Sequence, residues 1–242
     1  MRRTKADGWH LQIPPGDDRA YRLAQVDDYS NLRRAKLPYM PELKFNIRAR
    51  CSSENIPGTW GFGLWNDPFS IRVMPNVEIL RLPALPNAAW FFFASSHNYL
   101  SIRDDLPAEG SLMATFRSPK IPPLMLTLAV LGLPLLLLPP IARMVRRAGR
   151  LLVQQGAALL SHNPTDWHEY GLEWRSRAVA FELDGERVFE TQVSPNPPLG
   201  LVIWVDNQYA AALPNGRIRY GRLANQEPAW VEVDQIEVLR SL

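Results

Sequence analysis

The stretch Trp167–Glu190, WHEYGLEWRSRAVAFELDGERVFE, decides the fold of this chain. Large apolar residues alternate with polar ones in Tyr170–Arg175 and again in Val179–Leu183, which is the period of a half-buried β-strand. The dipeptide Asp184-Gly185 marks a tight hairpin turn, because glycine accepts the positive φ that such turns need. The stretch therefore predicts antiparallel strands joined by tight turns.

Further strands are predicted on both sides of this stretch. Glu42–Cys51 alternates apolar and polar residues, as a strand with one buried face does. Thr59–Trp65 contains two glycines, which predicts a bulge or the close approach of something flat. Ala88–Ser95, AAWFFFAS, is continuously apolar and is expected to be buried on both faces. The remaining predicted strands are Tyr21–Val26, Val77–Leu82, Ser111–Phe116, Leu199–Val205 and Val231–Val238. Many strands with Pro- and Gly-rich turns favour an all-β, two-sheet antiparallel sandwich.

The aromatic pattern of these strands resembles one known family. The run Trp167-His168-x-Tyr170-x-x-Glu173-Trp174, with Phe181-x-x-Asp184-Gly185 after it and VEVDQIEV at Val231–Val238, is similar to the glycoside hydrolase family 16 domain of the concanavalin A-like lectin/glucanase superfamily. The resemblance covers roughly Pro41–Trp65 and Asp166–Leu242. It implies a jelly-roll sandwich whose concave face meets a β-linked polysaccharide. It also implies that His168, Tyr170 and Trp174 are structural.

The acids that the resemblance implies are missing from the expected strand. Retaining glycosidases use two carboxyl groups about 5–5.5 Å apart, and the resembled family takes both from one strand, as Glu-x-Asp-x-(x)-Glu. The corresponding strand here is Ala88–Ser96, which has no carboxylate. The substitutes are an isolated acid at Glu78, surface acids at Asp104, Asp105 and Glu109, and closing-strand acids at Glu232, Asp234 and Glu237. No catalytic residue is therefore assigned.

Bulk properties limit the remaining options. A chain of 242 residues is long enough for one large β-domain, and residues 1–242 are expected to form one. The single cysteine, Cys51, excludes an internal disulfide and is expected to be structural. The four histidines lack the spacing of a zinc site, so no metal ligand is assigned. The net charge of +3 and the absence of a basic face interleaved with aromatics argue against nucleic-acid binding. No signal peptide is visible, and localisation stays open.

Aromatic and amide side chains suggest a glycan site. Sugar sites combine a flat aromatic ring with amide or carboxylate groups that bind hydroxyls. We expect the ligand-binding residues to be Trp60, Trp65, Trp204, Asn207 and Tyr209. The alternative is that these aromatics fill the core between the sheets. That alternative is preferred for Trp90 and for Phe91–Phe93.

An apolar insertion, residues 120–160, interrupts the strands. Ile121–Ala142 has 22 residues without a charge, but its five prolines would break a helix and strands of one domain lie on both sides, so a true span is disfavoured. Arg143–Leu160 alternates basic and apolar residues at roughly helical spacing. We expect a loop or short helical hairpin that dips into one leaflet of a membrane. The alternatives are contact with a protein partner and packing on the sandwich. The contact residues would be Leu124, Leu128, Leu135 and Leu137, with Arg143, Arg146, Arg147 and Arg150 on anionic headgroups.

Three functions follow from these observations. The favoured one is a non-catalytic, glucanase-like sandwich that binds a glycan or glycoconjugate and attaches peripherally to a membrane. The second is a family 16-type hydrolase of a β-linked polysaccharide with non-standard acids. The third is an assembly subunit that uses a retired sugar-binding fold for protein contact. No cofactor is expected, although the resemblance leaves open a structural calcium ion on the convex face.

Overall fold

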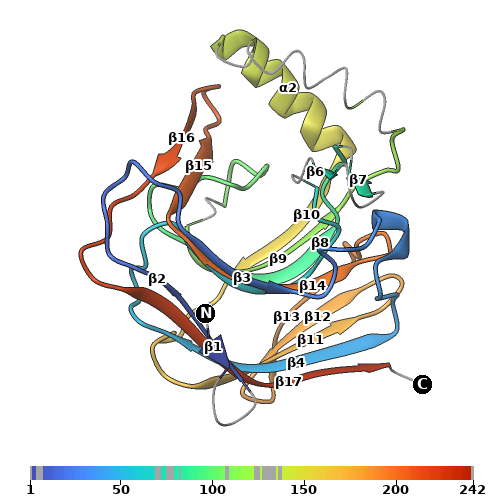
Figure 1. Cartoon of the computed structure of the whole chain (residues 1–242). Coiled ribbons are helices and arrows are strands. Elements are labelled where there is room, and N and C mark those ends of the chain that lie inside the picture. The colour runs from blue at the N-terminus through green and yellow to red at the C-terminus, as the bar shows by residue number, and fades with distance from the viewer. Residues whose placement is uncertain are drawn as a thin grey trace.

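The computed structural model describes residues 2–3, 8–68, 72–74, 79–81, 83–106, 109–122, 126, 135 and 138–240. Two antiparallel sheets lie face to face as a β-sandwich (Figure 1), which confirms the predicted all-β fold. In spatial order, the seven-stranded sheet contains β1 (Arg2–Arg3), β2 (Trp9–Ile13), β17 (Ala229–Arg240), β4 (Leu43–Cys51), β11 (His168–Trp174), β12 (Val179–Leu183) and β13 (Glu186–Thr191). The six-stranded sheet contains β10 (Gln154–Leu159), β9 (Gly110–Arg117), β8 (Ala88–Ala94), β5 (Thr59–Trp65), β14 (Gly200–Asp206) and β3 (Leu23–Asp27).

Smaller elements lie outside the two sheets. They are the hairpin of β15 (Gln208–Ala212) and β16 (Ile218–Arg222), the pair β6 (Arg72–Met74) and β7 (Ile79–Arg81), the 3-10 helix η1 (Arg34–Lys36) and the helix α2 (Pro139–Leu152). The six-stranded sheet curves, and its concave side faces away from the other sheet (Figure 1). The β15–β16 hairpin and α2 rise on opposite sides of this concave face, and α2 crosses over it.

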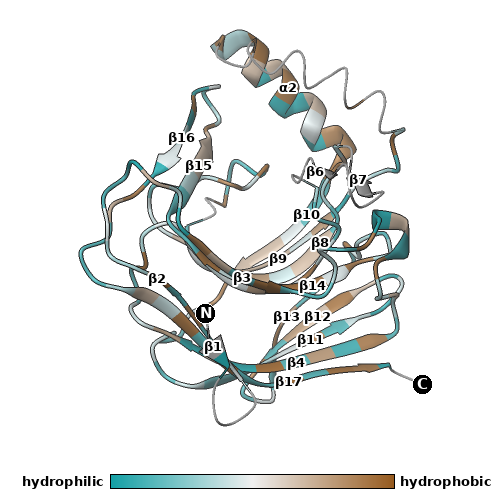
Figure 2. Cartoon of the chain, viewed as in Figure 1, coloured by the Kyte–Doolittle hydropathy of each residue, from teal (hydrophilic) through white to brown (hydrophobic). Residues whose placement is uncertain are grey.

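The core lies between the two sheets and follows the alternation of the strands. In β4 every second residue from Leu43 to Cys51 is buried, as its pattern predicted. Tyr170 of β11 lies edge-on to both Phe62 and Phe91, with 5.0 Å between ring centroids in each case. Apolar stretches run along the strands of both sheets in Figure 2. The predicted structural role of Tyr170 agrees with this position, because its side chain is 1% exposed.

The predicted hairpin turn forms at Asp184-Gly185. Both residues have positive φ, 50° for Asp184 and 82° for Gly185, as a two-residue turn between twisted strands requires. The Asp184 carboxylate also bonds the neighbouring strand, since it lies 2.7 Å from Nδ1 of His168 and accepts a hydrogen bond from the backbone N–H of Glu169. These contacts fix the register between β11 and β12.

The apolar insertion differs from its predicted form. Helical spacing was expected over Arg143–Leu160, but α2 ends at Leu152, and Gln154–Leu159 is the strand β10, paired with β9 from Gln154–Arg117 to Leu159–Leu112. The exposed edge of β9 offers backbone partners to this segment, and such tertiary pairing overrides a short helical pattern. Leu135 is 53% exposed, while Leu124, Leu128 and Leu137 lie outside the described residues. Within the described ranges, no helix has the length and apolar character to cross a bilayer.

Candidate binding face on the concave sheet

Among the described residues, six aromatic rings form a continuous layer on the concave face. Trp90 is at its centre, and its ring centroid lies 5.7 Å from those of Phe92 and Trp204, 5.8 Å from that of Trp65 and 6.2 Å from that of Phe116. Tyr29 extends the layer beyond Trp65, at 6.2 Å. We call these six residues the aromatic floor. The floor is built from four strands of the six-stranded sheet and the segment after β3.

Two glycines in β5 make this layer possible. β5 lies between β8 and β14, with Gly63 opposite Trp90 and Gly61 opposite Trp204. A Cβ added to Gly61 would lie 2.3 Å from the Phe91 carbonyl oxygen and 2.9 Å from the Trp204 ring. The two indoles therefore occupy the space that β5 side chains would fill. The glycines of this strand predicted a bulge or the close approach of a flat group. In the structure, the Trp204 ring approaches Gly61 closely.

The two outer tryptophans are held by hydrogen bonds from their indole N–H groups. Trp65 Nε1 donates to the Tyr29 hydroxyl at 2.5 Å, and Trp204 Nε1 donates to Thr59 Oγ1 at 3.0 Å. The Thr59 hydroxyl in turn donates to Asp206 Oδ1 at 2.9 Å. These hydrogen bonds fix the orientation of the Trp65 and Trp204 indoles.

The floor is not uniformly accessible. Phe92 and Trp204 are 7% and 9% exposed and form one buried cluster with Tyr29 and Leu37. Trp65, Trp90 and Phe116 are half-buried. A ligand that stacks on the floor would therefore meet Trp65, Trp90 and Phe116 before the three buried rings.

The structure separates the five residues predicted to bind a ligand. Trp65 and Trp204 both belong to the aromatic floor. Trp60 instead lies between the sheets, is 2% exposed and stacks on Phe93 with 3.6 Å between ring centroids. Asn207 is fully buried. Tyr209 is on β15, outside the sheet.

The side chain of Asn207 makes three hydrogen bonds to backbone groups. Its Oδ1 accepts a hydrogen bond from the backbone N–H of Arg22, and its Nδ2 donates to the carbonyl oxygens of Ala20 and Leu223. These three bonds join β14 to the segments before β3 and after β16. The predicted amide contact with sugar hydroxyls is therefore already made within the protein.

Two carboxylates lie on the concave side of the six strands, and they are far apart. Asp27 of β3 is opposite Val202 of β14, whereas Asp206 lies four residues further along β14. At ~3.4 Å per residue this separates the two side chains by about 14 Å. Asp206 is also occupied, since it accepts hydrogen bonds from Thr59 and from the Tyr21 hydroxyl. Burial raises the pKa of Asp206 to about 6.

The single thiol of the chain is inert in character. Cys51 is 1% exposed, and its Sγ lies 3.2 Å from the carbonyl oxygen of Ser53. Burial raises the pKa of Cys51 to about 12, so the nucleophilic thiolate is disfavoured at neutral pH. In the part of the chain that the structure describes, no group of three metal-ligating side chains occurs.

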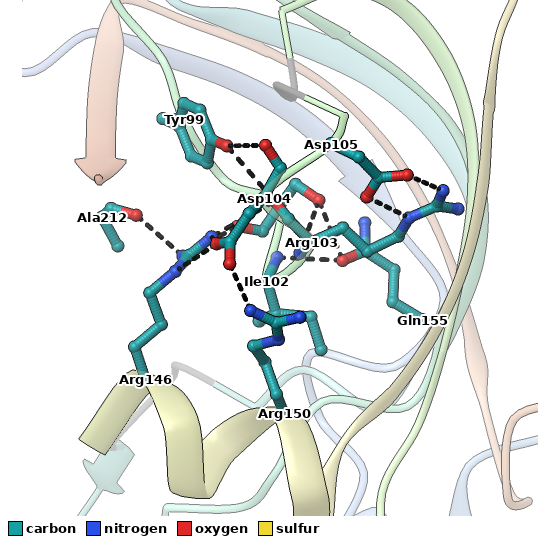
Figure 3. A network of polar contacts seen from close by, with 10 residues as sticks. Tyr99, Ile102, Arg103, Asp104, Asp105, Arg146, Arg150, Gln155 and Ala212 are labelled. Carbon is teal, nitrogen blue, oxygen red and sulfur yellow. Dashed lines mark hydrogen bonds and ion pairs between the residues drawn. The ribbon is translucent and has the colours of Figure 1, made fainter. Parts of the chain in front are cut away.

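Arginines of α2 fasten the helix above the concave face (Figure 3). Arg146 donates hydrogen bonds to the carbonyl oxygens of Ser101, Arg103 and Ala212, and to Asp104 at 2.9 Å. Arg150 pairs with the same carboxylate. The hydrogen bond from Arg146 holds the pKa of Asp104 below its ordinary value. Two of the four arginines predicted to face headgroups are thus engaged within the molecule.

The apolar side of α2 faces outward as a result. Figure 2 shows apolar and polar stretches along this helix. Leu151 is 87% exposed, Met144 63%, Leu152 47% and Val145 45%. Arg143 and Arg147 are exposed beside this side, and neither has an ion pair with a described residue. The helix therefore has the reverse of the usual polarity of a surface helix, whose apolar side packs on the protein.

Four residues of the floor, Trp90, Phe92, Phe116 and Tyr29, were not predicted as site residues. Trp90 was assigned to the core because Ala88–Ser95 is apolar throughout. β8 is indeed buried on both sides, but Trp90 and Phe92 point to the concave face while Phe91 and Phe93 point into the sandwich. The period of two along this strand separates the two sets. Nothing in the sequence alone indicated which set faces out.

The chain is similar to several solved structures at low sequence identity. No family model matches the chain, and no curated protein matches it. Among solved structures, the chain is similar to a Bacillus licheniformis β-glucanase (8% identity, 97% of this chain and 78% of that one, TM-score 0.45). It is also similar to a glycosyl hydrolase family protein from Mycobacterium fortuitum (10%, 96% and 75%, 0.45) and to the catalytic domain of a Thermotoga petrophila laminarinase (10%, 97% and 77%, 0.39).

Proposed function

We propose that this protein binds a glycan or glycoconjugate on its concave face without hydrolysing it. The observation that carries the proposal is the aromatic floor, in which Trp65 and Trp90 lie side by side and only half-buried on a curved sheet. Flat rings of this kind stack on the apolar faces of sugar rings. The fixed indole of Trp65 supports the proposal, because a ligand would meet a platform that is already ordered.

The absence of hydrolysis is supported by the carboxylates. Retaining enzymes need two carboxyl groups about 5–5.5 Å apart, and inverting enzymes need about 6.5–9.5 Å. Asp27 and Asp206 are about 14 Å apart by their register, and they are the carboxylates that the six described strands direct to the concave side. The strand Ala88–Ala94, which is the best candidate by order along the chain for the acid-bearing strand of the resembled family, carries aromatic rings and no carboxylate. A hydrolase with non-standard acids is therefore the weaker reading.

We further propose that the protein attaches peripherally to an anionic membrane through α2. The supporting observation is the outward apolar side of the helix, with Met144, Leu151 and Leu152 exposed. Arg143 and Arg147 flank that side and have the charge to meet anionic headgroups. A helix with one apolar side and flanking arginines lies in the interface plane of a bilayer and does not cross it.

A second function, an assembly subunit, is favoured by one observation. Phe92 and Trp204 are nearly buried, so part of the floor is already used as a small core. A protein that retained the fold only for contact would fill its groove in this way. The outer side of α2 would then meet a protein surface, as exposed apolar patches commonly do.

A binding and hydrolysis screen distinguishes these functions. The purified full-length protein is titrated with β-glucans, galactans and lipid-linked glycans, and each mixture is assayed for new reducing ends. Saturable binding to one class without new reducing ends supports the proposal. New reducing ends from a pure preparation would overturn the non-catalytic part. Failure to bind any class would leave the assembly subunit as the better account.

A further inference from the structure

A pocket lies at one end of the sandwich, apart from the aromatic floor. Its volume is about 630 Å³, within the range of small-molecule sites in proteins. It is bounded by the loop between β4 and β5, the loop after β8 and the start of β9. The residues that line it are Glu54, Asn55, Ile56, Pro57, Trp60, Phe93, Ala94, Ser95, Ser96, His97, Glu109, Gly110, Ser111, Leu223 and Ala224.

The base of this end pocket is apolar and ordered. Trp60 and Phe93 contribute to it, and their rings stack nearly parallel, at an interplanar angle of 4°. Ile56 beside them is 4% exposed. The walls are joined by hydrogen bonds, because the carbonyl oxygen of Gly58 accepts one from the backbone N–H of Ser95 and another from the side chain of Asn98. The pocket is therefore formed before any ligand enters.

The rim of the end pocket is polar and acidic. Glu54, Glu109, Ser96 and His97 are exposed there. Among the described residues that line the pocket, none is lysine or arginine. Neither glutamate has an ion pair within the described part of the chain. An anionic ligand would meet two carboxylates and no cation, whereas an ammonium group would meet favourable charge.

We propose that the end pocket binds a small saturated ring that carries hydroxyl groups and a positively charged amino group, as an amino sugar does. The accessible apolar lining at Pro57, Leu223 and Ala224 meets the carbon face of the ring. Ser95, Ser96 and Asn55 offer partners to hydroxyls, and Glu54 and Glu109 attract the ammonium group. This site is separate from the concave face. The two proposals can fail independently.

The test uses three probes of similar size and different charge. Glucosamine, glucose and glucuronate are each titrated into the full-length protein, with affinity read by calorimetry and location read from chemical-shift changes at Ser95–His97 and Glu109–Ser111. We expect glucosamine to bind more tightly than glucose and glucuronate to bind least. Glu109→Gln should weaken glucosamine binding about fivefold, the size of one exposed charge pair, and leave glucose unchanged.

A matched control and two outcomes complete the test. Glu186→Gln removes an exposed carboxylate on the distant β12–β13 hairpin and should leave all three affinities unchanged. Equal affinity for glucosamine and glucose, insensitive to Glu109→Gln and Glu54→Gln, would overturn the charge part of the proposal. Shift changes absent from the pocket residues for every probe would overturn the site itself. Neither result bears on glycan binding at the aromatic floor.

Discussion

The indole rings of Trp90 and Trp204 lie 5.7 Å apart although a whole strand, β5, runs between the strands that carry them. The contact exists because Gly61 and Gly63 remove the side chains that β5 would otherwise place there. Sheet neighbours across one strand are usually about 9–10 Å apart. The aromatic floor is thus a consequence of glycine placement as much as of tryptophan content.

Replacing Gly61 by alanine should disrupt the floor. The added Cβ meets a backbone carbonyl at 2.3 Å, which cannot move aside without shifting β8. We expect the free energy of unfolding to fall by about 3 kcal/mol, the upper range for overpacking, as measured by urea denaturation. Gly149→Ala in α2 is the matched control, because nothing lies within 4 Å of its added Cβ; it should stabilise by about 0.5–1 kcal/mol. Equal effects at both sites would contradict this account.

Replacing Arg146 should release α2 from the loop beneath it. The guanidinium joins three carbonyl oxygens and Asp104, and its side chain is 9% exposed. In Arg146→Met we expect amide hydrogens of α2 to exchange about tenfold faster, because the helix opens locally. Arg147→Met, at an exposed position, should leave exchange unchanged. Unaltered exchange in Arg146→Met would mean that the network does not hold the helix.

Attachment to a membrane should depend on the outer side of α2. Leu151→Glu places a charge on the most exposed apolar position and should reduce co-sedimentation with phosphatidylglycerol vesicles more than tenfold. Binding should weaken with salt and be lower on pure phosphatidylcholine, because arginines contribute. Leu239→Glu, at a 52% exposed leucine on β17, is the control. If the wild-type protein fails to sediment and forms a dimer that Leu151→Glu dissociates, the occupant is a second copy instead.

His162 should make stability rise with pH. Burial, and the neighbouring His168, lower the pKa of His162 to about 4 from 6.5. Between these values the unfolded chain holds a proton that the folded protein does not, so stability is lost as pH falls from 6.5 to 4. His162→Gln should remove this part of the slope, as followed by urea midpoints across that window. An unchanged slope would mean that His162 titrates normally when folded.

Asp206 should make stability fall as pH rises, which is opposite to the effect of His162. Burial raises its pKa from 3.8 to about 6, so the folded protein keeps a proton that the unfolded chain releases, and stability falls as pH rises between these values. The full effect is about 3 kcal/mol. Asp206→Asn should remove that fall and leave the rise due to His162. The same measurement would contradict the assignment if the variant and wild-type curves ran parallel.

Sequence patterns predicted most of the fold, because burial alternates with a period of two residues along each strand. The alternation in Leu43–Cys51 and the Asp184-Gly185 turn both appear in the structure as predicted. The residues of the aromatic floor could not be predicted in this way. Trp90 and Phe91 are neighbours in an apolar run, and the sequence does not show which of them lies on the concave side of the sheet. The burial of Trp60 and Asn207 was not predicted for a related reason. Residue type alone does not distinguish a tryptophan or an asparagine that is buried in the fold from one that binds a ligand.

The chain segment before β10 shows a different limit. Helical spacing predicted a helix to Leu160, and the helix ends at Leu152 because β9 offers a free edge to Gln154–Leu159. The arginine row was visible in the sequence, but its partners in Asp104 and the carbonyls of a distant loop were not. Spacing gives the side of a helix on which residues lie. It does not say what that side meets.

Glycan binding by the proposed mode requires stacking on the accessible part of the aromatic floor. The direct measurement is the affinity of the best glycan from the screen for Trp90→Ala and Trp65→Ala, beside Trp167→Ala as the control. Trp167 lies by Arg48 and Arg50, 4.6 and 4.9 Å from its ring, on the other sheet. We expect binding to be about two- to tenfold weaker in each of the two floor variants, because each loses one stacking contact, and unchanged in Trp167→Ala. Unchanged affinity in both floor variants, with their folds intact, would contradict it.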